Sequence, residues 1–477
     1  MIEGLRPHPE IVATGLDWLP GVPAHWETRR IKTVLTEVDR RTSTGEEKLL
    51  SLRMVAGLVG HTEAGGKLIP PKALINFKKI EPGQIVMNRM RAASGLFGIA
   101  KESGLVSPDY AVFSQHVEAD LNYLLQLFKM PAMAAIFRAE SKGLGTGQSG
   151  FLRLYTDRFG PIPIPFPPLD EQRLIVRFLD WHGAMTGKLI RAKKRLIGLL
   201  NEQKQSIIHR AVTRGLDPNA KLKPSGDPLI GEIVDGWTMK RLRNVAEMRV
   251  SNVDKKVHEG ELAVRLCNYV DVYRNEEIGP DLAFMDASAT PHEIERFRLK
   301  IGDVLITKDS EDWRDIGVPA LVMTEADDLV CGYHLAMLRP FADKVDGAFL
   351  FWQLLGWAAR WSFAMQASGV TRFGLSQGAI KALPLVIPPL ETQQLIAAHI
   401  SAATSDIRTA IKDALNEITL IQEFRNRLIA DVVTGQLDVR AVAASLPDVA
   451  ESEPPDERLD EAEDEDIDAF AAEEEDA

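Results

Sequence analysis

The stretch PFPPLDEQRLIVRFL, from Pro165 to Leu179, recurs as VIPPLETQQLIAAHI, from Val386 to Ile400, at a shift of 221 in the numbering. The same shift pairs AVTRGLD, which ends at Asp217, with VVTGQLD, which ends at Asp438. In each copy a run of prolines, unsuited to a helix interior or a central strand, precedes a proline-free run that begins with acidic residues. Each copy therefore predicts a proline segment followed by a long helix, which extends from Leu169 to about Thr213 in the first copy.

The repeat extends over almost the whole chain. GLDWLPGVPAHW, ending at Trp26, matches GDPLIGEIVDGW, ending at Trp237, at a shift of 211, and EPGQIV at Glu81 matches KIGDVL at Lys300 at a shift of 219. Between these matching ends, short apolar stretches punctuated by turns predict strands, and one helical segment follows in each half, at about 122–141 and 347–366. Two copies with matching ends and divergent centres predict two mixed α+β globules, each of which recognises something different.

Each long helix carries an apolar stripe in alternating steps of four and three residues, which is a heptad pattern. Lys193 and the matched pair Lys204 and Arg425 interrupt it. The stripe predicts that the two helices pack on each other as an antiparallel coiled coil, with the globules at opposite ends and a pseudo-two-fold axis between them. The alternative is that each helix packs only on its own globule. The apolar seam residues are Leu179, Ile190, Ile197, Leu200, Ile207, Ile400, Ile411, Ile418, Ile421 and Leu428.

The charge of the chain is unevenly distributed. The formal net charge is −12, but the segment from Pro447 to Ala477 contains 16 acidic residues and one basic residue, so the rest of the chain has 55 basic and 52 acidic residues. A near-neutral body can carry local basic faces that bind phosphate. The acidic segment is too charged to fold alone, which favours a disordered, solubilising tail; a DNA-mimicking regulatory role is the alternative. Two cysteines, Cys267 and Cys331, suit a reducing cytosol.

Sequence motifs for catalysis or cofactor binding are absent or fail in context. No Asn/Asp-Pro-Pro-Tyr/Phe loop of an amino-methyltransferase occurs. GHTEAGGKL, from Gly60 to Leu68, has the wrong spacing for a P-loop, and a leucine stands where a hydroxyl residue is required. GTGQSG, from Gly145 to Gly150, is followed by a proline run rather than by a helix, so a dinucleotide site is not expected there. The ten histidines show no metal-ligand spacing.

The order of these segments resembles the specificity subunits of type I restriction-modification systems, from Gly15 to about Asp438. Thr392 departs from the pattern, since an acidic residue is expected there. The resemblance is carried by PPLDEQ at Pro167–Gln172, PPLETQ at Pro388–Gln393, the two segments ending at Trp26 and Trp237, and RGLDPNAKLKPSG between the halves.

The resemblance implies a non-catalytic, cytoplasmic DNA-binding subunit. Each globule would be a target-recognition domain that reads one half of a bipartite sequence, and the paired helices would set the gap and dock two methyltransferase subunits. Those partners would bind S-adenosylmethionine and methylate an adenine flipped out of the duplex. A separate restriction subunit would use ATP and Mg²⁺ for cleavage, and this chain would hold no cofactor or metal.

We therefore expect an α+β fold of two tandem recognition domains, each followed by a long helix. The expected ranges are 1–160 for the first target-recognition domain, 161–217 for its proline linker and helix, 218–383 for the second domain, 384–440 for its linker and helix, and 441–477 for the acidic tail.

Candidate DNA contacts are basic, amide and hydroxyl side chains near loops that occupy equivalent places in the two halves. Two other functions stay open: a coiled-coil adaptor that binds proteins without touching DNA, and a self-contained nuclease or methyltransferase. The candidates are Lys78, Lys79, Arg89, Arg91, Lys142, Gln148 and Ser149 in the first half, and Lys308, Arg314, Thr371 and Arg372 in the second.

Overall fold

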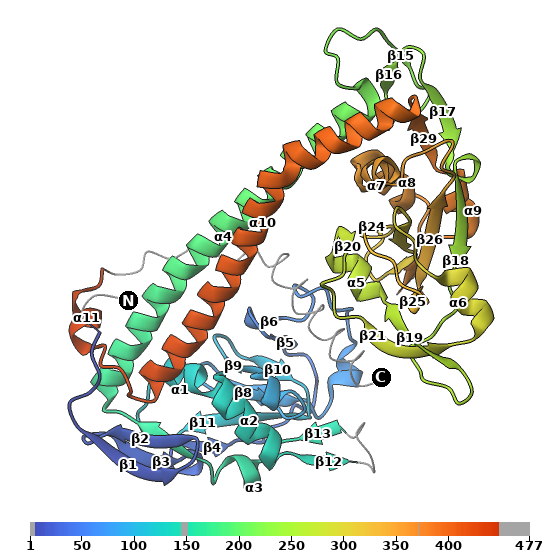
Figure 1. Cartoon of the computed structure of the whole chain (residues 1–477). Coiled ribbons are helices and arrows are strands. Elements are labelled where there is room, and N and C mark those ends of the chain that lie inside the picture. The colour runs from blue at the N-terminus through green and yellow to red at the C-terminus, as the bar shows by residue number, and fades with distance from the viewer. Residues whose placement is uncertain (1–4, 145–150, 371, 448–477) are drawn as a thin grey trace. The chain divides into compact units, whose positions relative to one another are not determined.

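The computed structural model describes residues 5–144, 151–370 and 372–447. These form two compact units: the first comprises 5–144, 151–192 and 416–447, and the second comprises 193–370 and 372–415. Each unit contains one globule and one part of each of the two long helices, α4 (Leu169–Arg214) and α10 (Leu390–Val433) (Figure 1). Both helices begin directly after a proline pair, as the repeated motif predicts. The five domain ranges remain predictions.

The first unit is built around a four-stranded sheet in the order β4-β11-β8-β9. Ile85 and Met87 of β8 face a core that also contains residues of α1 and α2, whereas Val86 faces a second cluster of buried side chains. The sheet is therefore buried on both faces. Its strands are β4 (Leu35–Glu37), β11 (Tyr110–Gln115), β8 (Ile85–Asn88) and β9 (Phe97–Ile99). The remaining elements are β1 (Ile11–Leu16), β2 (Leu19–Pro23), β3 (Glu27–Arg30), β5 (Leu50–Arg53), β6 (Gly57–Gly60), β7 (Lys78–Ile80), β10 (Gly104–Val106), β12 (Lys142–Leu144), β13 (Phe151–Arg153), β14 (Pro163–Phe166), α1 (Leu121–Phe128), α2 (Pro131–Glu140), α3 (Thr156–Phe159) and α11 (Arg440–Ser445).

The second unit repeats this plan with a five-stranded sheet in the order β18-β26-β22-β24-β20. Val304 and Ile306 of β22 face a core shared with α7 and α8, and Leu305 faces the core of a three-stranded sheet, β21-β19-β25. The strands are β15 (Leu222–Pro224), β16 (Glu232–Val234), β17 (Thr238–Arg241), β18 (Ala246–Val250), β19 (Leu262–Cys267), β20 (Glu277–Ile278), β21 (Met285–Ala289), β22 (Val304–Thr307), β23 (Asp309–Ser310), β24 (Pro319–Val322), β25 (Leu329–Cys331), β26 (Leu335–Pro340), β27 (Ser368–Gly369), β28 (Phe373–Gly374) and β29 (Pro384–Ile387). The helices are α5 (Tyr269–Arg274), α6 (Pro291–Phe297), α7 (Gly347–Leu355), α8 (Trp357–Ala364) and α9 (Gln377–Ala382).

The helical segment predicted in each half is in fact a pair of helices. In the first unit α1 ends before Pro131, which opens α2 at a position where its missing N–H is not needed. In the second unit Gly356, in extended backbone, separates α7 from α8. The prediction of one helix in each half rested on apolar residues, which continue on both sides of each break.

The two long helices pack together, as their apolar stripes predict. In the first unit Phe178 and Leu179, near the start of α4, share a core with Val432 near the end of α10. In the second unit Ile208, near the end of α4, shares a core with Ile400 near the start of α10. The start of each helix therefore lies with the end of the other, which is an antiparallel arrangement.

Burial follows the predicted seam more closely in α10 than in α4. In α10 every seam residue is buried or half-buried; in α4 only Leu179 is fully buried, and the completely buried residue near the end of the helix is Ile208 rather than Ile207. Lys204, which interrupts the stripe, is buried and forms an ion pair with Glu276. Half-buried seam residues are Ile190, Ile197, Leu200, Ile207, Ile411 and Ile421, and buried ones in α10 are Ile400, Ile418 and Leu428.

The glutamine that follows PPL makes the same hydrogen bonds in both copies of the motif. The side-chain oxygen of Gln172 accepts from the backbone N–H of Asp120, the residue that caps α1, and its amide donates to the carbonyl of Pro167, each over 2.8 Å. Gln393 makes the same two bonds to Asp346, the cap of α7, and to Pro388, each over 2.9 Å. A buried amide thus ties the proline segment to the first helix of each globule.

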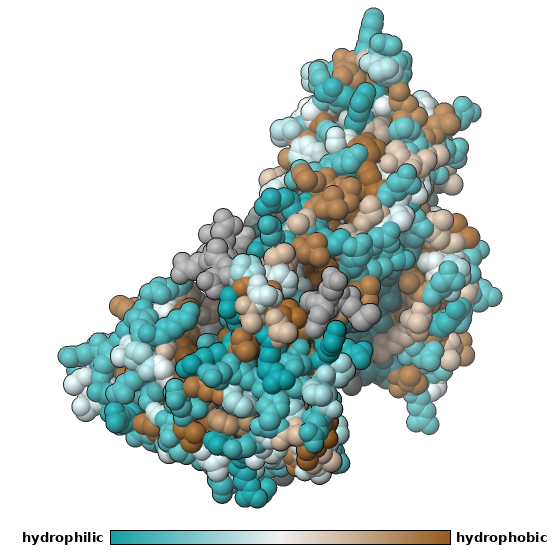
Figure 2. Space-filling model, turned by 90° about the vertical axis from the view of Figure 1, so that its left-hand side faces the viewer, coloured by the Kyte–Doolittle hydropathy of each residue, from teal (hydrophilic) through white to brown (hydrophobic). Residues whose placement is uncertain are grey.

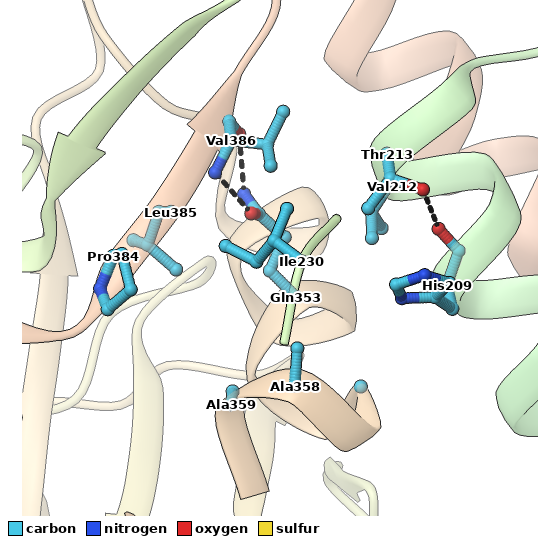
Figure 3. A pocket seen from close by; sticks show the side chains of 11 residues that line it. His209, Val212, Thr213, Ile230, Gln353, Ala358, Ala359, Pro384, Leu385 and Val386 are labelled. Carbon is cyan, nitrogen blue, oxygen red and sulfur yellow. Dashed lines mark hydrogen bonds between the residues drawn. The ribbon is translucent and has the colours of Figure 1, made fainter. Parts of the chain in front are cut away.

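The backbone of the strand before each long helix, at the equivalent residues Pro165 of β14 and Val386 of β29, has a different hydrogen-bond partner in each unit. The Tyr123 hydroxyl donates to the carbonyl of Pro165 and is also 3.1 Å from the carbonyl of Val433. In the second unit Gln353 exchanges two hydrogen bonds with the backbone of Val386, and a small pocket separates this pair from the His209 turn of α4 (Figure 3).

A tryptophan ring lies against the glycine that follows each long helix. Gly215 and Gly435 follow α4 and α10 in left-handed backbone, with φ of 68° and 74°. A Cβ on Gly215 would lie 3.2 Å from the ring of Trp237, and one on Gly435 would lie 2.9 Å from the ring of Trp26. Glycine is therefore needed both for the backbone turn and for the close approach of the ring.

Cys267 and Cys331 are buried free thiols in register on the adjacent strands β19 and β25. Among the described residues, no helix combines the length and the apolar character that crossing a bilayer requires.

Candidate nucleic-acid interface

In the first unit, a loop after the central strand lies beside a hairpin. Strand β8 ends at Asn88 and leads into Arg89 and Arg91, and the hairpin is formed by β12 and β13. The N–H of Leu154, just after β13, donates to the carbonyl of Arg89 over 2.9 Å. The Arg153 guanidinium also lies 3.9 Å from the sulfur of Met90. The structure thus brings the predicted residues Arg89 and Arg91 close to the hairpin that contains Lys142. The loop after the central strand and this hairpin are called the loop pair below.

The second unit has the same pair of segments. Strand β22 leads into Lys308, and β23 pairs with β28, so that Ser310 lies opposite Phe373. The N–H of Leu375 donates to the carbonyl of Lys308 over 2.8 Å. The shifts that align the two halves, 219 and 221, also relate Arg89 to Lys308 and Leu154 to Leu375. The backbone bond that joins the two segments is therefore repeated, whereas the side chains that they carry differ.

Some predicted contacts in the first unit already have internal partners. Lys78 is only 1% exposed, and its ammonium lies 3.2 Å from Glu37. Arg89 lies 2.6 Å from the same carboxylate, which also accepts from the Thr156 hydroxyl. Lys78 and Lys79 belong to β7, outside the loop pair, and Lys78 is a core ion-pair residue.

Two exposed lysines among the candidates of the first unit have acidic neighbours. The Lys79 ammonium is 2.7 Å from Glu47, and this hydrogen bond, together with those from the Thr42 hydroxyl and a backbone N–H, lowers the pKa of Glu47 to about 2. The Lys142 ammonium lies 3.9 Å from Asp157, and both side chains are exposed. Arg91 is exposed at the end of the loop after β8. Such exposed pairs are weak, so Lys79 and Lys142 would lose little by exchanging their carboxylate for a phosphate.

A histidine in left-handed backbone, between β25 and β26, contacts the loop pair of the second unit. His334 has a φ of 67°, and its Nδ1 lies 2.7 Å from Asp309, which also accepts from Lys308 over 2.9 Å. Burial raises the pKa of Asp309, but the bonds from His334 and Lys308 outweigh that effect and hold it at about 2. The ring of Tyr333 lies 3.9 Å from the His334 ring. A histidine at positive φ is uncommon and marks a locally constrained position.

A second aromatic feature lies in the loop after β23. Arg314 is 68% exposed, lies 2.8 Å from Asp312 and places its guanidinium 5.9 Å from the ring of Trp313. Trp313 is itself exposed, 6.5 Å from the exposed Trp361. Sequence reasoning selected Arg314 but missed His334 and the two tryptophans. The EDWRD stretch carried a signal, because an aromatic beside an arginine in a polar loop is typical of binding surfaces.

The remaining candidates are only partly described. Arg372 is exposed in the hairpin between β27 and β28. Gln148, Ser149 and Thr371 lie outside the described residues.

The two matched units correspond to a known protein family. Residues 68–197 and 235–418, together well over half of the chain, match the model of the type I restriction modification DNA specificity domain. The chain belongs to this family. The two matched ranges fall in the two halves of the repeat, and each reaches into the long helix of its half.

Two curated relatives come from Methanocaldococcus jannaschii. The type I restriction enzyme MjaVIII specificity subunit is 20% identical over 328 residues, which cover 66% of this chain and 71% of that protein. The putative type I restriction enzyme MjaX specificity subunit is 24% identical over 173 residues, which cover 36% of this chain and 40% of the relative. The chain thus spans less than half the length of the second relative.

The fold is also found among solved structures. A chain from a study of complex assembly and conformational transition of the type I restriction-modification system superposes with a TM-score of 0.58 at 15% identity, over 86% of this chain and 98% of that one. The HsdS subunit from Thermoanaerobacter tengcongensis matches with a TM-score of 0.41 at 16% identity, over 87% and 98%. The first of these likenesses supports the fold.

Proposed function

We propose that the chain is the non-catalytic specificity subunit of a type I restriction-modification complex and that each unit reads one half of a bipartite duplex target. The observation that carries this proposal is the loop pair held by one backbone hydrogen bond in both units, Leu154 to Arg89 and Leu375 to Lys308. A shared frame with different side chains is what two readers of different base sequences require. The exposed members of each pair supply cations for phosphate and for base edges.

The paired helices are the proposed docking surface for two methyltransferase subunits. Leu199 of α4 and Leu420 of α10 are equivalent in the repeat, and they are 58% and 62% exposed. Met185, Leu189 and Leu196 add to the exposed apolar residues of α4. Figure 2 shows apolar side chains at the surface in separate patches between hydrophilic ones. Repeat-related leucines on the two helices suit two copies of one partner, bound in equivalent ways.

In this proposal, partner subunits and not this chain carry out methylation and cleavage. The methyltransferase subunits would bind S-adenosylmethionine, and a restriction subunit would use ATP and Mg²⁺. The free thiols and the partner set fit a cytoplasmic location, which is part of this proposal. The acidic tail after residue 446 has no assigned role.

The experiment that tests this function exchanges residues 27–150 for the corresponding segment of another family member. The complex with methyltransferase subunits is then assayed by mapping methylated adenines. One half of the methylated sequence should change while the other half and the gap stay constant. An unchanged methylation pattern would contradict the proposal.

The competing function is an adaptor that binds proteins through its helices and never touches DNA. The two differ in the binding of duplex DNA by the chain with its methyltransferase partners. A specificity subunit predicts a binding constant whose logarithm falls linearly with the logarithm of salt concentration. An adaptor predicts that adding this chain leaves the DNA affinity of its partners unchanged.

A further inference from the structure

Three side chains from separate parts of the first unit meet at the first turn of α4. The Nε2 atom of His25, which follows β2, lies 2.7 Å from one carboxylate oxygen of Glu171. The Nε2 atom of His8, near the start of the chain, lies 3.7 Å from the other oxygen. One ligand atom from each of the three residues lies within 4.8 Å of the others, an arrangement found for no other such group in the described part of the chain.

His8 is the member of this cluster that the protein leaves unsatisfied. Its side chain is only 2% exposed, and its Nδ1 has no hydrogen-bond partner among the described residues. Its Nε2 stands beyond hydrogen-bonding distance of Glu171. A buried imidazole that the protein leaves short of hydrogen bonds is costly. Nε2 is the nitrogen of this ring that an ion beside Glu171 would meet.

We propose that His8, His25 and Glu171 bind a Zn²⁺ ion. In a tetrahedral zinc site with bonds of about 2.1 Å, neighbouring ligand atoms lie about 3.4 Å apart. The two Nε2 atoms lie 2.7 and 3.7 Å from different oxygens of Glu171, and one ligand atom of each residue lies within 4.8 Å of the others, so modest side-chain movements bring the three groups to that spacing. Two imidazoles and a carboxylate form a common zinc ligand set, which leaves the fourth position for water.

The surroundings of the cluster suit an ion. Glu171 is 6% exposed, whereas His25 is 41% exposed and opens a route from solvent. A cation, Arg440, also lies beside the cluster, with its Nε 3.8 Å from Glu171. Its guanidinium is held by Asp438 over 2.7 Å, so the charge of Arg440 is largely compensated. One carboxylate charge thus remains for a divalent ion.

The proposed ion would fix the start of the chain to the rest of the unit. His8 lies two residues after Arg6, whose carbonyl accepts from the N–H of Asp438 over 2.8 Å. The ion would therefore hold the N-terminal segment against both the start of α4 and the segment that follows α10. This is a structural role and does not depend on the proposed reading of DNA.

The second half of the repeat lacks these ligands. At the corresponding shifts of 211 and 221, the positions of His8, His25 and Glu171 are occupied by Asn219, Gly236 and Thr392. Zinc binding is therefore expected in the first unit and not at the equivalent place in the second.

The test uses the full chain, dialysed against a chelator and titrated with Zn²⁺, and separately with Co²⁺ as a spectroscopic probe. One equivalent of Zn²⁺ should raise the melting temperature by several degrees, and Co²⁺ should give visible absorption bands of a four- or five-coordinate ion. His25→Ala and Glu171→Gln should each weaken Zn²⁺ binding at least tenfold. His25 is exposed, so its replacement is expected to leave the metal-free fold intact, as circular dichroism would show.

His116→Ala is the matched control, since His116 is an exposed histidine of the same unit whose Nδ1 lies 3.0 Å from the hydroxyl of Thr36. It should bind Zn²⁺ and Co²⁺ as the wild type does. Equal binding by the wild type, His25→Ala and Glu171→Gln would show adventitious binding at other histidines and would overturn the proposal. No stabilisation and no absorption bands in the wild type would overturn it as well.

Discussion

Leu375 donates its backbone N–H to the carbonyl of Lys308 over 2.8 Å, and this bond joins the two surface segments that carry Arg314 and Arg372. The corresponding bond in the first unit runs from Leu154 to Arg89. Because the backbone supplies both partners, the side chains of either segment can change without loosening the frame. The two units thus share this backbone hydrogen bond, while the side chains of the segments that it joins differ.

The exposed arginines of the second unit are expected to contribute to DNA affinity by binding phosphates. Replacing Arg314 and Arg372 by alanine should weaken binding of duplex DNA by the complex and reduce the slope of log K against log salt by about one for each phosphate that no longer meets an arginine. Lys240→Ala, an exposed cation on β17, is the control and should leave the slope unchanged. Fluorescence anisotropy over a salt series measures both quantities. An unaltered slope in the double variant would remove these arginines from the interface.

Asp309 is expected to stabilise the second unit above acidic pH. Its pKa is about 2, below the usual value of 3.8, so its contribution is complete above about pH 4 and is lost as the pH falls toward 2. Since one pKa unit corresponds to about 1.4 kcal/mol, Asp309→Asn should cost about 2 kcal/mol at pH 7.

The measurement is the difference in melting temperature between wild type and Asp309→Asn from pH 2 to pH 7. That difference should shrink as the pH falls below 4. Asp281→Asn, at an exposed carboxylate, should show no such trend. A constant difference for Asp309→Asn across the range would show that His334 and Lys308 do not hold its pKa low.

The repeated segments could be predicted from sequence because their constraints are local. Proline before an acidic helix start and a heptad stripe both follow from backbone geometry, so α4 and α10 were placed correctly. The burial of Lys78 could not be predicted, since its partner Glu37 stands on another strand. The same holds for the cluster of His8, His25 and Glu171, whose members come from three separate segments and show no regular spacing.

Gln393 is expected to be required for stability because it is fully buried and its three hydrogen bonds reach Asp346, Lys344 and Pro388. Gln393→Leu keeps a similar volume but leaves these backbone groups unpaired, which should cost about 2 kcal/mol or more. Gln394→Leu is the neighbouring control at an exposed position and should change stability by less than about 0.5 kcal/mol. Thermal unfolding followed by circular dichroism compares the two variants. If Gln393→Leu were as stable as Gln394→Leu, the hydrogen bonds of Gln393 would not be needed for stability.

Leu199 and Leu420 are expected to anchor one methyltransferase subunit each. Because the two leucines are equivalent in the repeat, Leu199→Asp and Leu420→Asp should each reduce the number of bound subunits from two to one, and the double variant should bind none. A buried carboxylate without a partner is strongly unfavourable at an apolar interface, which is why aspartate is chosen. Sedimentation or native mass spectrometry of the assembled complex counts the subunits. Leu262→Asp, at an exposed leucine on β19, should leave two subunits bound, and normal assembly in the double variant would place the docking surface elsewhere.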